Sequence, residues 1–560
     1  MITFTFFTQG KSTAATAPAG SSLAQAVYTS GQADAPALCS GIGRCGQCRM
    51  RLDHAPSPSG DDLAYFSDTE IAEGWRLGCR HVVQEGMQVH LPDITPVRRR
   101  SPAGKADGQM MLAVDLGTTS LHWAAVGQEQ DSVRIVTEGS ETNPQMGAGS
   151  EVMSRLASAR EPAMRARLAM LVKKRIASII EELEVETGQQ IASCAIAGNA
   201  AMTNILLDLP VEGLSRAPYS LNYHGDDVVE LDIASAGTSR ATGSPKHNTL
   251  PPAYIPPQPA PFVGGDISAG MAHLCCTETA PEFPFILADL GTNGEFVLAL
   301  SPQKSLITSV AMGPALEGIG LTHGSMAQEG AATAFAVTPI GLTPAVLNAE
   351  GNAVAAAPAS MRPADVKAGS LQNAGAMRSI SGTGYLSLIH ALLRTGVLTR
   401  EGQFNLTSTS PIGQRLARNI IQPENSADRD GPKLVLAQGV TLSAHDVEEI
   451  LKVKAAFSLA FERLLCEASL SPSDVSHIFL AGTLGQHVAV ADLEALGFIP
   501  AELGPRTKAV GNSSLQGAIR LLTRPECRQW AADWSASTTS VDLTAAPDFT
   551  INYMRHMRFS

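Results

Sequence analysis

The sequence has no long apolar run, fewer basic than acidic residues and only nine cysteines among its 560 residues. No stretch reaches the roughly 18 apolar residues that a membrane-spanning helix needs. The N-terminus has no basic start followed by an apolar stretch, so we expect no signal peptide, and alternation at Ile2, Phe4 and Phe6 predicts a strand instead. A net charge of −12 argues against general nucleic-acid binding. We therefore expect a cytoplasmic protein with neither a membrane nor a nucleic acid as partner.

Four of the cysteines form a group that predicts a metal centre. In a reducing compartment, clustered cysteines more often bind metal or carry out redox chemistry than form disulfides. A 2Fe-2S cluster takes four thiolates, and the plant-type pattern brings three from one loop and one from a distant segment. Here Cys39, Cys45 and Cys48 form C-x5-C-x2-C, and Cys79 follows in "WRLGCR". These four residues are the predicted ligands of a 2Fe-2S cluster.

A zinc site is the alternative for this group. Structural zinc sites usually take their ligands as two close pairs, and here a second close pair is missing. A thioredoxin-like pair at Cys45 and Cys48 would leave the other two cysteines unexplained. Elsewhere in the chain, the adjacent Cys275 and Cys276 are predicted to be small buried packing residues.

Glycines in the cysteine loop support the cluster interpretation. They allow positive backbone angles, so that a tight loop can turn its amides toward cluster sulfurs. They stand at Gly41, Gly43 and Gly46.

The elements around the cysteines resemble the ferredoxin β-grasp fold over residues 1–95. Two N-terminal strands, a short helix over residues 22–28, the cysteine loop and a last strand near "MQVHLPDI" follow in that order. The first gap between cysteines is five residues, as in adrenodoxin-type ferredoxins, which implies a cluster loop of different shape from the plant type. Residues 96–109, rich in Pro, Gly and charge, are predicted to be a linker in which Arg98, Arg99 and Arg100 are solvated.

The rest of the chain contains an internal repeat. "MLAVDLGTTSLHWAAV" (111–126) and "FILADLGTNGEFVLAL" (285–300) share an apolar strand, Asp-Leu-Gly-Thr, a polar turn and a second apolar strand. Each repeat predicts a β-hairpin whose turn amides and hydroxyls can hold phosphate oxygens. Asp115 and Asp289 stand at the strand ends and can reach Mg2+ or its waters. The phosphate-binding candidates are Gly117, Thr118 and Thr119 in the first turn and Gly291, Thr292 and Asn293 in the second.

A third motif lies near the C-terminus. In "VSHIFLAGTLGQHV" (475–488) an apolar strand runs into Gly482 and Gly485, which let the backbone approach a flat ligand closely. Before it, residues 443–468 predict a packing helix with Ser443 as N-cap. Lys452 and Lys454 on that helix can approach adenine or ribose, but the solvated interpretation is the preferred one.

In this order the three motifs resemble the nucleotide-binding elements of the actin, sugar-kinase and heat-shock-chaperone ATPase superfamily. With "AIAGNAAMTNILL" (195–207), "FVGGDISAGM" (262–271), "MGPALEGIGLTHG" (312–324) and "SISGTGYLSLIHALLRTGVL" (379–398), the chain is similar to the reductive activators of corrinoid proteins. The resemblance implies a multidomain α+β and α/β protein, with a β-grasp ferredoxin followed by a two-lobed, duplicated ribonuclease-H-like (actin-like) ATPase. The predicted domains are residues 1–95, the linker 96–109, a first lobe 110–207 and a second, larger lobe 208–560.

The resemblance also implies the function. It implies ATP-dependent transfer of one electron from a 2Fe-2S cluster to a corrinoid protein of a methyltransferase system, which reduces Co(II) to Co(I). Asp115 and Asp289 would organise Mg2+ and the attacking water, and Gly482 and Gly485 would flank the adenosine. An upstream low-potential electron donor and a homodimer are further implications.

Three other functions remain open at this point. One is an activator of the 2-hydroxyacyl-CoA dehydratase type, which the separate N-terminal ferredoxin module argues against. The second is a small-molecule kinase with a redox-sensing appendage. The third is a non-enzymatic, ATP-gated scaffold with a structural cluster.

Overall fold

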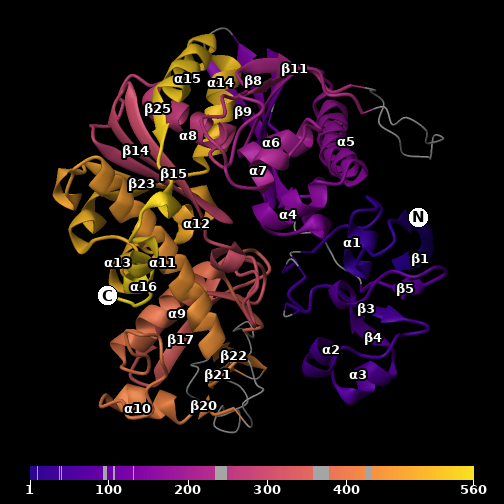
Figure 1. Ribbon diagram of the computed structural model, residues 1–560, viewed down its shortest axis with the longest axis vertical. Coiled ribbons are helices and arrows are strands. Elements are labelled where there is room, and N and C mark those ends of the chain that lie inside the picture. The colour runs from indigo at the N-terminus through magenta and orange to yellow at the C-terminus, as the bar shows by residue number, and fades with distance from the viewer. Residues whose placement is uncertain are drawn as a thin grey trace. The chain divides into compact units, whose positions relative to one another are not determined.

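The computed structural model describes the whole chain apart from residues 9, 37, 40, 44, 93–97, 105–107, 130–131, 234–248, 357–376, 424–429 and 438. The chain forms two compact units (Figure 1). Unit 1 consists of Met1–Glu282, Ala299–Ile307 and Asn512–Ser540, and unit 2 of Phe283–Leu298, Thr308–Gly511 and Val541–Ser560. Among the described residues, no helix is both long and apolar enough to cross a membrane.

The N-terminal part of unit 1 is a five-stranded sheet in the order β2-β1-β5-β3-β4. As the alternating pattern predicted, the side chains of Phe4 and Phe6 on the first strand are buried. The helix predicted over residues 22–28 is present, and Ser22 caps it by accepting a hydrogen bond from the Gln25 amide. The elements are β1 (Ile2–Thr8), β2 (Lys11–Ala17), α1 (Leu23–Tyr28), β3 (Arg49–Leu52), α2 (Gly60–Tyr65), α3 (Asp68–Ala72), β4 (Trp75–Leu77), the short 3-10 helix η1 (Gly78–Arg80) and β5 (Gln88–His90).

The second part of unit 1 is built on a seven-stranded sheet in the order β11-β12-β10-β7-β8-β9-β6. An apolar cluster of strand and helix side chains forms the core on one side of this sheet. The strands are β6 (Arg99–Arg100), β7 (Gln109–Leu116), β8 (Ser120–Glu129), β9 (Ser132–Thr142), β10 (Ile191–Gly198), β11 (Asp227–Val229) and β12 (Ala253–Ile255). The helices are α4 (Val152–Ala159), α5 (Pro162–Thr187), α6 (Ala200–Leu206), α7 (Glu212–Ser215), α8 (Gly265–Cys275), α14 (Ser513–Thr523) and α15 (Pro525–Ser537).

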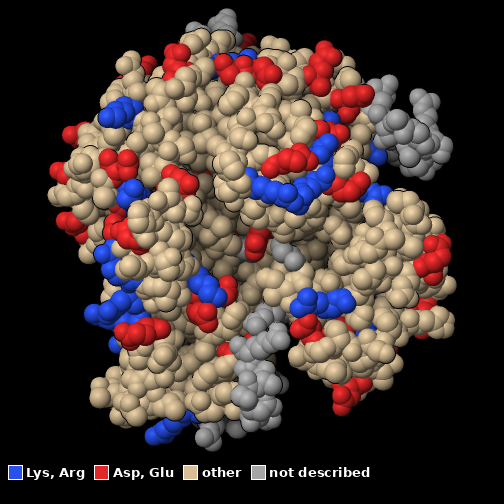
Figure 2. Space-filling model, viewed as in Figure 1, with Lys and Arg blue, Asp and Glu red and all other residues tan. Residues whose placement is uncertain are grey.

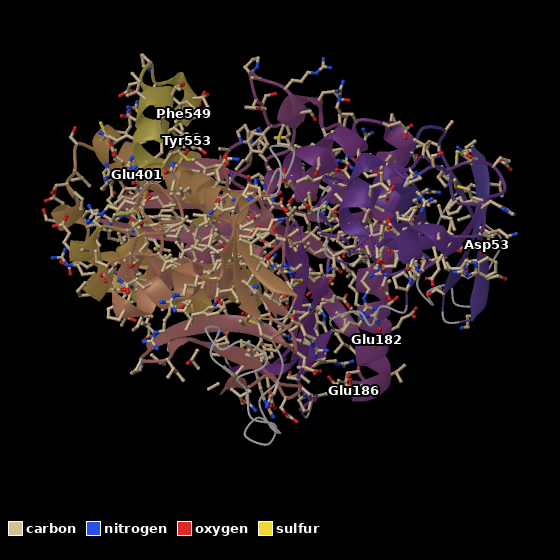
Figure 3. All side chains as sticks on the ribbon, turned by 90° about the horizontal axis from the view of Figure 1, so that it is seen from below. Asp53, Glu182, Glu186, Glu401, Phe549 and Tyr553 are labelled. Carbon is tan, nitrogen blue, oxygen red and sulfur yellow. A yellow bond between two sulfur atoms is a disulfide. The ribbon has the colours of Figure 1, made fainter. Side chains whose placement is uncertain are left out.

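Part of the predicted linker joins this sheet. Arg99 and Arg100 are exposed, as expected for a solvated run, yet they form β6 and pair with β9. The guanidinium of Arg100 forms ion pairs with Glu182 and Glu186 of α5, which are labelled in Figure 3. These ion pairs therefore connect strand β6 to helix α5.

Unit 2 contains most of a six-stranded sheet and two small sheets. The large sheet has the order β24-β23-β13-β14-β15-β25, and the small ones β18-β17-β16-β19 and β20-β21-β22. The large sheet contains β13 (Phe285–Leu290), β14 (Asn293–Ser301), β15 (Lys304–Ala311), β23 (His477–Ala481), β24 (Thr507–Gly511) and β25 (Thr538–Ser540). The small ones contain β16 (Ala331–Thr338), β17 (Gly341–Leu347), β18 (Ala353–Ala355), β19 (Ser379–Ile380), β20 (Ile420–Ile421), β21 (Lys433–Ala437) and β22 (Val440–Ser443). The helices of unit 2 are α9 (Gly382–Arg394), α10 (Pro411–Ala417), α11 (Ala444–Glu467), α12 (Gly482–His487), α13 (Val490–Leu496) and α16 (Phe549–His556).

The internal repeat is visible in both large sheets. The first copy of the repeat is the antiparallel pair β7 and β8, and the second copy places β13 next to β14. Beside the first strand of each copy lies a parallel strand, β10 in one sheet and β23 in the other. The two hairpins predicted from sequence are therefore confirmed, and each is embedded in the same local strand order.

Helices α8 and α14 pack closely in unit 1 because Gly517 has no side chain. A Cβ atom at that position would lie 1.8 Å from the carbonyl oxygen of Ala269. Near the end of α8, Cys276 forms a disulfide with Cys527 of α15. The prediction that Cys276 is only a packing residue is therefore wrong, because its partner lies 251 positions away in the chain and the local sequence does not show it.

The charged residues do not form a basic surface on the face shown in Figure 2. Acidic and basic side chains stand there in small mixed groups over both units. This distribution agrees with the negative net charge and offers no broad positive patch on that face for a phosphate backbone.

We predict that Gly517→Ala lowers the stability of the protein by about 1–3 kcal/mol, because the new methyl group must push the α14 backbone away from α8. The matched control is Gly60→Ala on α2, where a Cβ would meet no atom within 4 Å. Thermal unfolding followed by circular dichroism measures both variants. An unchanged midpoint for Gly517→Ala would show that the helices can separate without cost.

Candidate functional site

The four predicted cluster cysteines meet as two pairs. The thiol of Cys45 is hydrogen-bonded with that of Cys39, and the thiol of Cys48 with that of Cys79. Cys39 and Cys48 are each only 2% exposed. These hydrogen bonds, together with burial, hold the pKa values of Cys45 and Cys48 well above their usual range, whereas the hydrogen bond from Cys48 lowers the pKa of Cys79.

This two-and-two arrangement bears on the choice between iron–sulfur and zinc. A binuclear cluster has two irons for its four thiolates, so two pairs of ligands suit it. The donor set therefore fits an iron–sulfur cluster better than a single zinc ion.

Backbone geometry and two neighbouring side chains shape the cysteine loop. Its three glycines have φ values of 84°, 85° and 67°, as their predicted role requires. Arg80, next to the fourth cysteine, donates a hydrogen bond to the Ile42 carbonyl at 2.8 Å and pairs with Asp61 of α2. A Cβ on Gly43 would lie 2.5 Å from Arg80 Nε, and one on Gly46 would lie 1.8 Å from Tyr65 Oη. The loop is thus held by side chains that occupy the space the glycines leave.

A buried carboxylate, not recognised from the sequence, fixes the segment that carries Cys79. The side chain of Asp62 is fully buried and accepts hydrogen bonds from the Ser59 amide and hydroxyl, the Leu77 amide and the His81 ring, each at 2.7 Å. Burial opposes ionisation, but the hydrogen bonds led by Leu77 and Ser59 outweigh it and lower the pKa of Asp62. The spacing of Ser59 and Asp62 is that of a capping box, which was the available sequence signal.

In unit 1 the first phosphate-loop carboxylate already has two hydrogen-bond donors. Asp115 accepts hydrogen bonds from Asn512 Nδ2 at 2.7 Å and from Ser514 Oγ at 2.9 Å. Both donors come from the start of α14, where Asn512 is also the N-cap and accepts a hydrogen bond from the Leu515 amide. The Gly-Asn sequence before a helix signals such a cap, but nothing local signals contact with Asp115.

Buried polar side chains support the first turn from behind. Asn143 Nδ2 donates to the Gly117 carbonyl at 2.7 Å, and the guanidinium of Arg155, which is fully buried, donates to the Thr118 carbonyl at 2.6 Å. In a trans peptide the N–H points opposite to the carbonyl, so the amides of Thr118 and Thr119 point away from this support. The turn can therefore present the Thr118 amide to an anion.

In unit 2 the second and third motifs lie next to one another. Parallel pairing of β13 with β23 places Asp289 opposite Ala481, directly before Gly482. Gly482 has φ 81°, and a Cβ on it would lie 2.8 Å from Asp289 Oδ1. Gly485 instead lies against the backbone of Leu480, where a Cβ would be 2.9 Å from the carbonyl carbon. In the structure, the backbone of these two glycines approaches Asp289 and Leu480 of β23 closely. The sequence predicted a close approach to a flat ligand.

The second hairpin turn contacts a carboxylate from another segment of unit 2. Thr292 Oγ1 donates to Glu317 Oε1 at 2.9 Å. Glu317 ends a short 3-10 helix over Pro314–Glu317, within the "GPALEG" stretch. This places a second acidic side chain beside the turn that carries Thr292.

The preferred sequence interpretation of Lys454 as solvated is wrong. Its side chain is buried, and Nζ donates to the carbonyls of His556 and Arg558 at 3.2 and 2.9 Å. Burial, with a contribution from Arg558, lowers the pKa of Lys454 to about 8. Folding of the C-terminal segment over α11 covers this lysine, which the helix sequence alone does not reveal. Lys452 remains at the surface, paired with Glu448 and Glu449.

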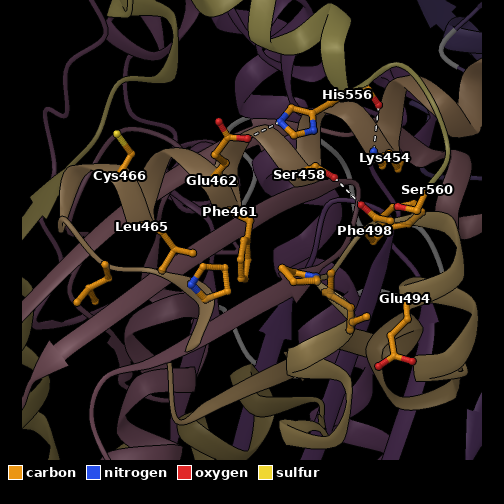
Figure 4. A pocket seen from close by; sticks show the side chains of 16 residues that line it. Lys454, Ser458, Phe461, Glu462, Leu465, Cys466, Glu494, Phe498, His556 and Ser560 are labelled. Carbon is orange, nitrogen blue, oxygen red and sulfur yellow. Dashed lines mark hydrogen bonds and ion pairs between the residues drawn. The ribbon is translucent and has the colours of Figure 1, made fainter. Parts of the chain in front are cut away.

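A cavity of about 530 Å³ lies beside Lys454 (Figure 4). It is also lined by Leu470 and Pro472, which precede β23, whereas Gly482 follows that strand. The cavity is therefore at the other end of β23 from the glycine turn and is not the predicted adenosine site.

Three regions of the chain match models of known protein families. Residues 6–84 match the 2Fe-2S iron-sulfur cluster binding domain, residues 110–277 the RACo middle region, and residues 284–560 the C-terminal domain of RACo, the ASKHA domain.

Three relatives illustrate the range of similarity. The corrinoid activation enzyme RamQ of Eubacterium limosum is 24% identical over 90% of this chain and 78% of its own length. The reductase of the methylated-amine-specific Co(II) corrinoid protein of Methanosarcina barkeri is 26% identical over 53% of this chain and 49% of its own. One of the subunits of the Na+-translocating NADH-quinone reductase of Actinobacillus succinogenes is 40% identical over 15% of this chain and 20% of its own.

The fold has a counterpart among solved structures. A reductive activator for a corrinoid, iron-sulfur protein superimposes with a TM-score of 0.63 at 19% identity, covering 100% of this chain and 98% of its own. The fold class predicted from the sequence is therefore confirmed. An iron–sulfur binding domain, the RACo middle region and an ASKHA ATPase domain follow one another in one chain, and the protein belongs to the family of reductive activators of corrinoid proteins.

Proposed function

We propose that this protein uses ATP to deliver single electrons from a 2Fe-2S cluster to a corrinoid protein of a methyltransferase system, reducing Co(II) to Co(I). The observation that carries the proposal is the union, in one chain, of a four-cysteine ferredoxin-type domain with a RACo-type ATPase. Relatives named for corrinoid activation and for reduction of a Co(II) corrinoid protein support the choice of substrate.

The need for ATP follows from the energetics of electron transfer. Plant-type clusters have potentials of about −400 mV. For one electron, every 59 mV by which the acceptor lies below the donor costs about 1.4 kcal/mol. Reduction of Co(II) to Co(I) is an uphill step of this kind, and hydrolysis of one ATP to ADP and phosphate can be coupled to it by favouring different conformations before and after hydrolysis.

The four cysteines would hold the cluster, which supplies one-electron transfer when bound. Their two-and-two pairing supports the 2Fe-2S type, since each pair can serve one iron. Asp62 and Arg80 hold the segment with Cys79 at the cysteine loop, so the four sulfurs keep their mutual positions when the charge of the site changes.

Asp115 and Asp289 are proposed to organise Mg2+ and the attacking water. Asn512 and Ser514 fix the carboxylate of Asp115, which removes the cost of orienting it when the metal binds. The amides and hydroxyls at Gly117, Thr118 and Thr119 and at Gly291, Thr292 and Asn293 would bind phosphate oxygens, and Gly482 and Gly485 would flank the adenosine.

The location and partners complete the proposal. The chain would work in a reducing cytoplasm, receive electrons from an upstream low-potential donor and act as a homodimer. The predicted domain boundaries belong to the same proposal.

We expect the anaerobically reconstituted protein to contain about two irons and two sulfides per chain. Cys48→Ser should lose most of this iron and the visible absorption, because one iron loses a thiolate ligand. The matched control is Cys466→Ser, since Cys466 is an exposed free cysteine on α11. Iron and sulfide analysis with visible spectroscopy measures the effect. A wild-type protein that binds one zinc and no iron would exclude the cluster.

Asp289→Ala should reduce ATP hydrolysis by about a hundredfold or more, because the carboxylate that orients metal and water is lost. The cluster spectrum should not change. Asp533→Ala is the control, as Asp533 is exposed and accepts a hydrogen bond from Gln529 on the same helix, α15. Phosphate release is measured with and without excess EDTA, which should stop hydrolysis in the wild type. Undiminished hydrolysis in Asp289→Ala would refute the assigned role.

ATP should accelerate reduction of a purified Co(II) corrinoid protein when titanium(III) citrate supplies electrons to the activator. Formation of Co(I) is followed by its absorption, in parallel with no nucleotide, with a non-hydrolysable ATP analogue and with Cys48→Ser. Equal rates with and without ATP would contradict the proposal. ATP-dependent phosphorylation of a sugar or acid would point to a kinase instead.

A further inference from the structure

Tyr28, the last residue of α1, has a buried hydroxyl without a partner. Its side chain is 1% exposed, and Oη has no hydrogen-bond partner among the residues that the structure describes. A buried hydroxyl loses its hydrogen bonds to water on folding, so leaving it unpaired is costly. Such a group in a native core calls for an explanation, and a bound group that accepts the hydrogen bond is one.

The surroundings of Tyr28 indicate where that acceptor would be. Helix α1 packs against η1, which carries Cys79. Tyr28 and Cys48 belong to one buried cluster, against which Cys79 also packs. Burial is the main cause that raises the pKa of Tyr28, and Cys48 and Cys45 are near enough to the phenol to contribute.

We propose that Tyr28 Oη donates a hydrogen bond to a coordinated cysteine sulfur of the cluster site and thereby raises its reduction potential. The inference rests on the proposed 2Fe-2S site and extends it by naming a residue that tunes it. Coordinated thiolate sulfur is electron-rich and can accept an O–H, and hydrogen bonds to sulfur are among the factors that set cluster potentials. The phenol therefore changes from an unpaired group to a paired one when the cluster is bound.

The sign of the effect follows from charge. Reduction adds one negative charge to the cluster and its ligands, so an O–H donor stabilises the reduced state more than the oxidised state. The cluster would then accept an electron from its donor more readily and release it less readily. Onward transfer to cobalt would depend more strongly on ATP as a result.

Redox titration of the full-length, cluster-loaded protein tests this inference. Tyr28→Phe should lower the equilibrium constant for one-electron reduction by about three- to tenfold, and tenfold corresponds to a shift of about 59 mV to lower potential. The control is Tyr219→Phe, because Tyr219 lies outside the cysteine domain and is 47% exposed, so water can replace its hydroxyl. Titanium(III) citrate is the reductant, and the fraction reduced is read from the electron paramagnetic resonance signal.

A stability measurement without any redox step provides an independent test. In the cluster-free protein, Tyr28→Phe removes only an unpaired hydroxyl, so its thermal midpoint should equal or exceed that of the wild type. In the cluster-loaded protein the order should reverse, because the wild type alone has the O–H to sulfur bond. The reversal uses the same pair of proteins and does not depend on activity.

The outcomes separate this inference from the proposed function. Equal potentials for wild type and Tyr28→Phe, with both fully loaded, would overturn the hydrogen bond and leave the cluster assignment standing. The same order of thermal midpoints with and without cluster would also overturn it. A wild-type protein that cannot be loaded with iron would instead refute the proposed function itself.

Discussion

Four cysteine sulfurs gathered at one site, two of them buried and two half-buried, are the constraint on which the N-terminal domain depends. Hydrogen bonds to the other two cysteines, together with burial, raise the pKa values of Cys45 and Cys48, so these two thiols do not ionise freely. The residues around the four sulfurs position the cysteine loop and do not simply fill a core. The loop glycines admit Arg80 and Tyr65, Asp62 fixes the segment with Cys79, and Tyr28 retains an unpaired hydroxyl among the described residues. A cluster in this position would bind the thiolate forms of these cysteines and replace their protons with iron.

The ATPase part meets a different requirement, which is to hold carboxylates and amides still before the ligand arrives. Asp115 is fixed by two side chains from a segment nearly four hundred positions later, and the turn after it is supported by a fully buried arginine. In unit 2, Asp289 lies against a glycine in a conformation that disfavours other residues. Such preorganisation makes electrostatic catalysis effective, because no energy is needed to orient dipoles during the reaction.

The two parts of the chain therefore address complementary problems. The cluster site sets how strongly an electron is held, and hydrogen-bond donors such as Tyr28 can adjust that value. The ATPase supplies free energy for a transfer that the potential alone does not favour. A cluster with a higher reduction potential accepts an electron from its donor more readily, but its transfer of that electron to cobalt is less favourable. The cluster potential therefore determines how much free energy ATP must supply.

The sequence by itself determined the motifs whose residues are close along the chain. It predicted the cysteine loop with its glycines, both Asp-Leu-Gly-Thr hairpins and the capped helix after Ser443, since hydrophobic period, turn residues and caps are local signals. The fold class followed from the resemblance of its motifs to a known family. Only the tertiary structure decided the partners. The contacts of Asp115 with Asn512, of Thr292 with Glu317 and of Cys276 with Cys527, and the burial of Tyr28 and Lys454, join distant segments. No local pattern encodes them, because they arise from the packing of whole elements.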